Sequence, residues 1–307
     1  MVINTIFTFL SFVICLILNP LIMNLISFSK FTLILAFCGF SSGIFAQDTT
    51  SFKTYYDDGL AKYKSKDYTG AIADFDKAIE KKADYANAYF YRATSKRMGP
   101  KDNQGALADY DNAIKYLANN SDYYSGRAQT KVNLKDYAGA IADYTMVIQF
   151  KPASEKGYFE RGNAKLMNKE YQGAVDDYKL AIDLKADYFE AYNMRGKAKL
   201  NLQDTTAAME DYNKAIELKS DFVLAYNNRA LLKYIKKDFE GAKTDYSKVV
   251  EIKPEDGASY FNRAIALIAL KQKPDACTDF NKAKELGYTK ADDMITKYCK
   301  DQQQQPK

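Results

Sequence analysis

The sequence has 307 residues, of which 47% are hydrophobic and 27% are charged, so neither a disordered chain nor a polytopic membrane protein is expected. It contains no histidine, which excludes Ser-His-Asp and Cys-His nucleophiles, histidine general bases and histidine metal ligands. The net charge of +5, from 44 basic and 39 acidic residues, comes without long basic runs and gives little support for nucleic-acid binding.

The beginning of the chain differs sharply in composition from the rest. Lys30 is the only charged residue before Asp48. If translation begins at Met23, a weakly positive start ending at Lys30 is followed by an apolar run over residues 31–40 and a stretch rich in small residues over 41–46. That order is typical of a secretory signal peptide.

We therefore expect residues 23–46 to be a signal peptide and the protein to be exported, to the periplasm or the outside of the cell. Ala46 suits the position before cleavage, and residues 47–51 then form a short linker. Because Ile44 is larger than the residue usually found two positions earlier, cleavage after Gly43 is a second possibility.

Residues 1–22 form an apolar extension that has two interpretations. Either Met1 is an over-extended start, or residues 2–26 stay attached as a hydrophobic hairpin that anchors the protein in a membrane. Cys38 follows a segment similar to a bacterial lipoprotein box, although Phe37 stands where that box has Gly or Ala. Membrane association is expected only through this N-terminal part.

The rest of the chain is built from one repeated unit. The motif Ala-Ile-Ala-Asp-Phe, with close variants, begins at Ala71, Ala106, Ala140, Ala174, Ala208, Ala242 and Ala276, spaced by 35 residues once and then by 34. The corresponding blocks are 52–85, 86–120, 121–154, 155–188, 189–222, 223–256 and 257–290. A 34-residue period is typical of a helix-turn-helix unit.

Each block has two stretches of helical periodicity, separated by a break such as Lys135-Asp136-Tyr137. Counted from the first residue of each block, repeat position 4 is always Tyr and repeat position 8 is always Gly or Ala. The second stretch carries Ala at position 20, an aromatic residue at position 24 and Ala or Val at position 27. This apolar stripe predicts an antiparallel helix pair, with the stripe packed against the first helix.

These residues resemble the tetratricopeptide repeat family over residues 52–290. Tyr replaces the family's Trp at position 4, Arg replaces Leu at position 7, and Lys largely replaces Tyr at position 11; the terminal proline survives only as Pro152 and Pro254. The resemblance implies an all-α, right-handed superhelical solenoid whose first helices line a concave groove. Such a groove docks a protein or peptide.

Two sets of charged residues recur at fixed positions. Position 7 is Arg92, Arg127, Arg161, Arg195, Arg229 and Arg263, and position 23 is Asp74, Asp109, Asp143, Asp177, Asp211, Asp245 and Asp279. In an antiparallel pair these positions lie at similar heights, so each guanidinium can reach a carboxylate in its own block or the neighbouring one. We interpret the two sets as a structural ladder, with a binding stripe as the alternative.

Candidate partner-binding residues come from position 5 of the first helices. The aromatic and amide residues there are Tyr56, Phe90, Phe159, Asn193, Asn227 and Phe261. Exposed rings can accept apolar side chains, and Asn side chains can hydrogen-bond to the backbone of an extended peptide. The alternative is that some of these rings are buried between repeats.

Two cysteines remain after the leader, Cys277 and Cys299. Residues 291–300 can form a capping helix antiparallel to the last repeat helix, which places the two cysteines at the same height. A disulfide is therefore expected in an oxidising compartment, with two buried thiols as the alternative. Residues 301–307 are expected to be a disordered tail.

The sequence thus predicts a non-catalytic scaffold outside the cytoplasm that binds a protein or peptide partner. The alternative is a structural spacer subunit anchored in the cell envelope by the N-terminal apolar segment or by a lipidated Cys38. Catalytic residues, cofactors and metal sites are not expected, because the carboxylates follow the repeat and no Gly-rich phosphate loop or Cys-x-x-Cys motif is present.

Overall fold

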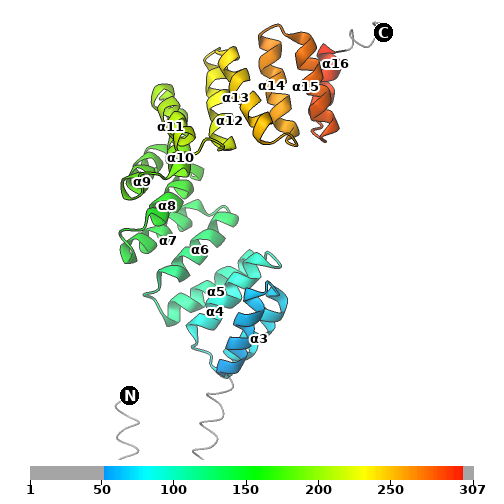
Figure 1. Ribbon diagram of the computed structural model, residues 1–307. Coiled ribbons are helices and arrows are strands. Elements are labelled where there is room, and N and C mark those ends of the chain that lie inside the picture. The colour runs from blue at the N-terminus through cyan, green and yellow to red at the C-terminus, as the bar shows by residue number, and fades with distance from the viewer. Residues whose placement is uncertain (1–51, 300–307) are drawn as a thin grey trace, which may run out of the picture. The chain divides into compact units, whose positions relative to one another are not determined.

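The computed structural model describes residues 52–299. The expected signal peptide, the possible anchors, the linker and the C-terminal tail lie outside the described residues. The chain divides into two compact units, with the boundary between Pro100 and Lys101, and each unit is described by itself (Figure 1).

The described part of the first unit is helical over residues 52–64, in α3 (Tyr68–Lys81) and in α4 (Ala86–Met98). Aromatic rings form much of its core. Tyr56 packs against Phe75 and Tyr85 with ring centroids 5.9 and 4.9 Å apart. These contacts join the helices of the first pair to the start of the second.

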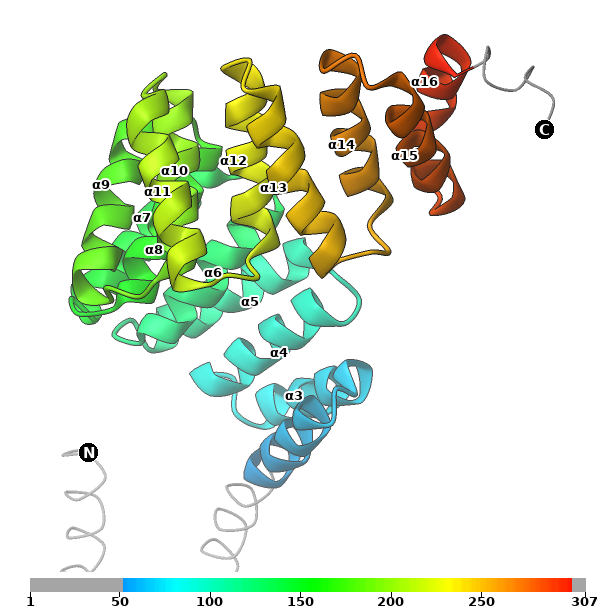
Figure 2. The same cartoon turned by 45° about the horizontal axis from the view of Figure 1, so that its top comes forward.

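The second unit continues with helices in an unbroken series. They are α5 (Asn103–Tyr116), α6 (Ser121–Asn133), α7 (Tyr137–Phe150), α8 (Glu155–Met167), α9 (Tyr171–Leu184), α10 (Phe189–Asn201), α11 (Thr205–Leu218), α12 (Val223–Ile235), α13 (Phe239–Ile252), α14 (Gly257–Ala269), α15 (Lys273–Glu285) and α16 (Ala291–Tyr298). Each helix packs against the next along the chain (Figure 2). The described residues contain no strand, and the predicted all-α solenoid of helix pairs is confirmed.

Small residues at position 8 make room for the ring at position 24 of the same repeat. A Cβ atom added to Gly162 would lie 2.9 Å from the ring of Tyr178, and one added to Gly196 would lie 2.8 Å from the ring of Tyr212. Repeats with Ala at this position accommodate the methyl group, since Ala128, for example, is fully buried in the core. A larger side chain would separate the two helices.

The turn inside each pair has a recurring geometry. Lys135 has a left-handed backbone with φ of 63°, and Asp136 then caps α7 by accepting a hydrogen bond from the Gly139 N–H at 2.9 Å. Non-glycine residues with positive φ occupy the same position in every repeat: Lys66, Lys101, Lys135, Lys169, Gln203, Lys237 and Lys271. This conformation is unfavourable for a residue with a Cβ atom.

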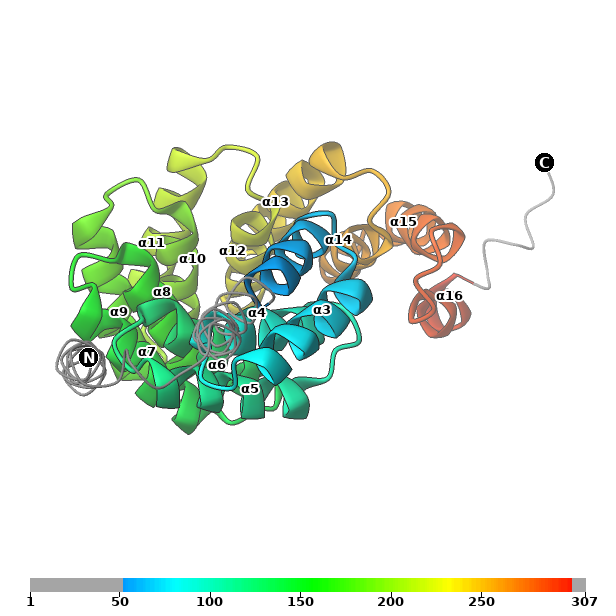
Figure 3. The ribbon, with the colours of Figure 1, turned by 90° about the horizontal axis from the view of Figure 1, so that it is seen from below.

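Helix α16 covers the end of the last repeat. It lies beside α15 (Figure 3), and its residues Met294, Ile295 and Tyr298 pack on the cluster that contains Leu267 and Phe280. The last repeat would otherwise expose this apolar surface, as terminal repeats of a solenoid do without a cap. Within residues 52–299, no helix is both long and apolar enough to cross a membrane.

Candidate interaction surfaces

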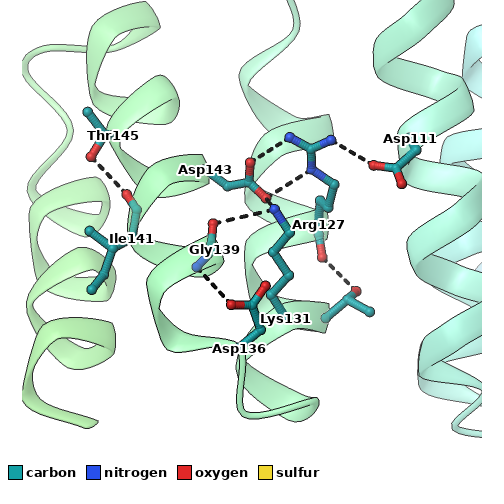
Figure 4. A network of polar contacts seen from close by, with 10 residues as sticks. Asp111, Arg127, Lys131, Asp136, Gly139, Ile141, Asp143 and Thr145 are labelled. Atoms are coloured by element: carbon teal, nitrogen blue, oxygen red, sulfur yellow. Dashed lines mark hydrogen bonds and ion pairs between the residues drawn. The ribbon is translucent and has the colours of Figure 1, made fainter. Parts of the chain in front are cut away.

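Arg127 and Asp143 form the centre of a polar network inside the third repeat (Figure 4). The Arg127 Nε and Nη2 atoms donate to the two carboxylate oxygens of Asp143 at 2.9 and 2.6 Å. The third nitrogen, Nη1, donates to Asp111 on the preceding second helix, α5, at 2.7 Å. One guanidinium therefore links the two helices of its own repeat to the repeat before it.

The same bidentate pair recurs along the second unit. It joins Arg161 to Asp177, Arg195 to Asp211, Arg229 to Asp245 and Arg263 to Asp279, with N–O distances of 2.7–2.9 Å. In the first unit, Arg92 bonds to Asp76 at 2.6 Å and Asp74 pairs with Lys62. Asp109 is buried like the other aspartates at position 23.

Sequence reasoning missed two further members of this network. Lys131, at position 11, places its Nζ 2.8 Å from Asp143, and the ring of Tyr124, at position 4, lies 5.5 Å from the Arg127 guanidinium carbon. The same tyrosine-arginine contact is present in all six repeats that have Arg at position 7. The three departures from the family pattern, at positions 4, 7 and 11, therefore form one cluster. Because all three recur together along the sequence, this recurrence could have indicated that the residues contact one another.

The surroundings of Arg127 favour its charged form. Burial lowers the pKa of Arg127, but hydrogen bonds to Asp143 and Asp111 outweigh burial and raise the pKa above its ordinary value. Burial raises the pKa of the nearby tyrosines Tyr178 and Tyr212 at position 24. Both shifts move these pKa values away from neutral pH, so Arg127 stays charged and the two tyrosines stay neutral, which suits a structural role better than proton transfer.

The aromatic residues at position 5 pack against other aromatic rings. Tyr56 is only 9% exposed. Phe159 contacts the rings of Tyr178 and Tyr188, and Phe261 contacts Phe280 and Tyr288. Phe90 is half-buried and contacts Tyr91. Phe90, Phe159 and Phe261 are all only half-buried, so partner binding at these rings stays a prediction.

Asn193, one of the two amides predicted to bind a partner, is buried, and its role in binding stays a prediction. It is 2% exposed, and its Oδ1 accepts a hydrogen bond from Asn228 on α12 at 2.8 Å. Asn227 is half-buried, and its Oδ1 is covered and has no hydrogen-bond donor among the described residues. Asn193 therefore lies at the junction of α10 and α12, where the spacing along one helix did not reveal the contact with the next.

The exposed residues of α12 form an apolar stripe. Leu224, Leu231 and Ile235 are 58%, 47% and 56% exposed and recur at intervals of seven and four residues, so they share one face of the helix. We call these three residues the α12 stripe. Direct contacts join α10 to both α8 and α12, which shows that the first helices adjoin one another on the same side of the second unit.

Cys277 and Cys299 are joined by a disulfide, with Cα atoms 5.6 Å apart. Both residues are buried. The bond fastens the end of α16 to the start of α15, beside the apolar cluster that α16 covers. Among residues 52–299, no cluster of acidic or sulfur-containing side chains could hold a metal ion.

Comparisons with known proteins agree with this architecture. A tetratricopeptide repeat family model matches residues 189–222 and 223–256, the fifth and sixth blocks. The comparison with curated proteins found no match.

Three solved structures illustrate the shared fold. A tetratricopeptide repeat protein from Parabacteroides merdae is 20% identical with a TM-score of 0.65, over 82% of this chain and 98% of its own. Yeast Tom70 is 20% identical with a TM-score of 0.57, over 82% of this chain and 54% of its own. A MamA protein is 24% identical with a TM-score of 0.51, over 57% of this chain and 96% of its own.

Proposed function

Because the chain is a tetratricopeptide repeat protein, we propose that it is a non-catalytic scaffold that binds a protein or peptide segment on the first helices of its second unit. Proteins of this family generally act by interaction, and the fold alone names no ligand. The observation that carries the proposal is the exposure of the α12 stripe.

The chemistry of this surface favours an apolar segment. On α12 and α14, positions 2, 5, 9, 12 and 13 carry no charged residue: they are Leu224, Asn227, Leu231, Tyr234, Ile235, Ala258, Phe261, Ile265, Ile268 and Ala269. The exposed side chains of the α12 stripe are costly to leave in water, and exposed apolar surface of this kind typically marks a contact with another molecule. The amide of Asn227 adds a group that can reorient to hydrogen-bond a peptide backbone.

Substitution of the α12 stripe tests the proposal. Leu231→Glu together with Ile235→Glu should reduce the proteins captured from native extracts while leaving the melting temperature nearly unchanged, because both side chains are exposed. Leu180→Glu with Leu184→Glu, on the second helix α9, adds the same charge at exposed leucines elsewhere and serves as the matched control. Equal capture by all three proteins would rule out this surface.

We further propose that the scaffold works outside the cytoplasm. The order of charge, apolar run and small residues at the start of the sequence supports export, and the disulfide between Cys277 and Cys299 is a bond that persists in oxidising compartments. Cell fractionation with sequencing of the mature N-terminus tests this. Recovery in the membrane fraction with residues 2–26 or a lipidated Cys38 retained would favour the anchored spacer instead.

A further inference from the structure

Four repeats of the second unit contain the same small cation site. The ammonium groups of Lys131, Lys165, Lys199 and Lys233, at position 11, lie 2.8–2.9 Å from the Oδ2 atom of the aspartate at position 23. In three of them the ammonium also lies 3.4–3.5 Å from the carbonyl oxygen at position 19. Each buried aspartate thereby receives an arginine and a lysine.

The seventh repeat lacks the lysine. Position 11 is Leu267, and Asp279 keeps its pair with Arg263, whose Nε donates to Oδ2 at 2.7 Å. Position 19, which is Gly or Ala in every other repeat, is Asp275. At positions 11 and 19, the seventh repeat has therefore lost one positive charge and gained one negative charge relative to the four repeats with the lysine.

One lysine lies nearby but is engaged elsewhere. Lys243 on α13 replaces the apolar residues found at position 21 of the first five repeats, and it lines the same space. Its ammonium pairs with Glu240 at 2.6 Å and lies 3.5 Å from the Gln272 amide oxygen. Lys243 pairs with Glu240, and Lys273, which replaces uncharged residues at position 17, is not among the residues that line this space. The lining therefore keeps two carboxylates, Asp275 and Asp279, without the position-11 lysine of the other repeats.

An open cavity lies beside Leu267 and Asp279 in the seventh repeat. Its volume is about 360 Å³, within the ordinary range for small-ligand sites. Residues of α13, α14 and α15 line it. Asp275 and Asp279 provide carboxylates on its wall, Ser247 and Thr278 provide hydroxyls, and Leu267 provides an apolar patch. Asp279 is buried, whereas Asp275 is exposed at the rim.

We propose that this cavity binds a primary alkylammonium group, which takes the place that the lysine ammonium occupies in the four sister repeats. The cation would pair with Asp279 and Asp275, and its aliphatic stem would lie against Leu267. Two sources share this chemistry, a free small amine and a lysine side chain of a partner protein. The site shares no residue with the α12 stripe, so a negative result for one surface does not decide the other.

The first test is a titration of the purified, disulfide-intact chain with n-butylammonium, followed by the backbone amide NMR signals of α13, α14 and α15. Saturable shifts are expected, and neutral n-butanol should produce none at the same concentrations. Absence of saturable butylammonium binding, or equal binding of butanol, would overturn the proposal.

The second test uses mutations that either supply an ammonium group within the site or remove one of its carboxylates. Leu267→Lys restores the internal ammonium and should weaken butylammonium binding by about tenfold or more, while Leu267→Met keeps the site uncharged and should retain binding. Asp275→Asn should also weaken binding without disturbing the Arg263 pair. Unchanged affinity in both Leu267→Lys and Asp275→Asn would overturn the proposal, with melting curves verifying that each variant is folded.

A third arm separates the two sources. Nα-acetyl-lysine N-methylamide presents the same ammonium with flanking peptide groups. The Ser247 hydroxyl, whose oxygen accepts from Arg263 Nη1 at 3.4 Å, keeps its own proton to donate to a peptide carbonyl. Tighter binding of this probe than of butylammonium indicates a partner's lysine, and equal or weaker binding indicates a free amine. Failure of both probes in the wild-type chain rejects the site altogether.

Discussion

Arg161 and Asp177 lie sixteen residues apart and are joined by two parallel hydrogen bonds across the interior of one helix pair, at 2.9 and 2.7 Å. Lys165 supplies a second cation at 2.9 Å, and the Arg161 guanidinium lies beside the ring of Tyr158. Because the bidentate geometry is directional, the pair fixes the relative height of its two helices. Recurrence of the pair sets the same offset in successive repeats.

Arg161→Leu should lower the free energy of unfolding by about 3 kcal/mol, because breaking a buried pair leaves the Asp177 carboxylate with only one cation. The far-ultraviolet circular dichroism spectrum should stay helical, since each pair is local to its repeat. Urea denaturation at neutral pH measures the loss. The double variant Arg161→Leu with Asp177→Leu should recover part of the lost stability. If Arg161→Leu alone is as stable as the wild type, the pair contributes little.

The repeat organisation could be predicted from the sequence because its signals are local. The period, the small residue at position 8 and the stripe on the second helix each report contacts within one helix pair. Asn193 could not be placed because its contact comes from the next repeat, where Asn228 donates a hydrogen bond to it. The cavity at Leu267 depends on three helices, so no single spacing in the sequence indicates it.

Asn193→Asp should reduce stability, because Asn193 is buried and a carboxylate there would lose water without gaining a cation. We expect a loss of about 1–3 kcal/mol in urea unfolding. Asn201→Asp, on the same helix but exposed, is the matched control and should stay close to wild type. Equal stability of the two variants would contradict the buried position of Asn193.

Lys135→Gly should raise stability by up to about 1 kcal/mol, because glycine adopts a positive φ without the steric cost that a Cβ atom adds, although its unfolded state is more flexible. Lys179→Gly, at an exposed position inside α9, removes the same side chain from a helical backbone and should lose about 1 kcal/mol. Thermal or urea unfolding of the two variants gives the comparison. Destabilisation of both to the same extent would mean that the left-handed turn carries no strain.

The disulfide between Cys277 and Cys299 should stabilise the end of the solenoid. It closes a loop with a sequence separation of 22 residues, for which the loss of chain entropy in the unfolded state predicts about 3 kcal/mol. Cys299→Ser should therefore lower the unfolding free energy of the C-terminal helices most. Hydrogen exchange of α15 and α16 should increase while exchange of α7 and α9 stays unchanged, because coupling along a solenoid passes only through neighbours. Thiol titration of the protein purified from its native compartment, denatured without reductant, provides the direct chemical check. Two free thiols in that measurement would contradict the bond, and they would also remove one of the two supports for export.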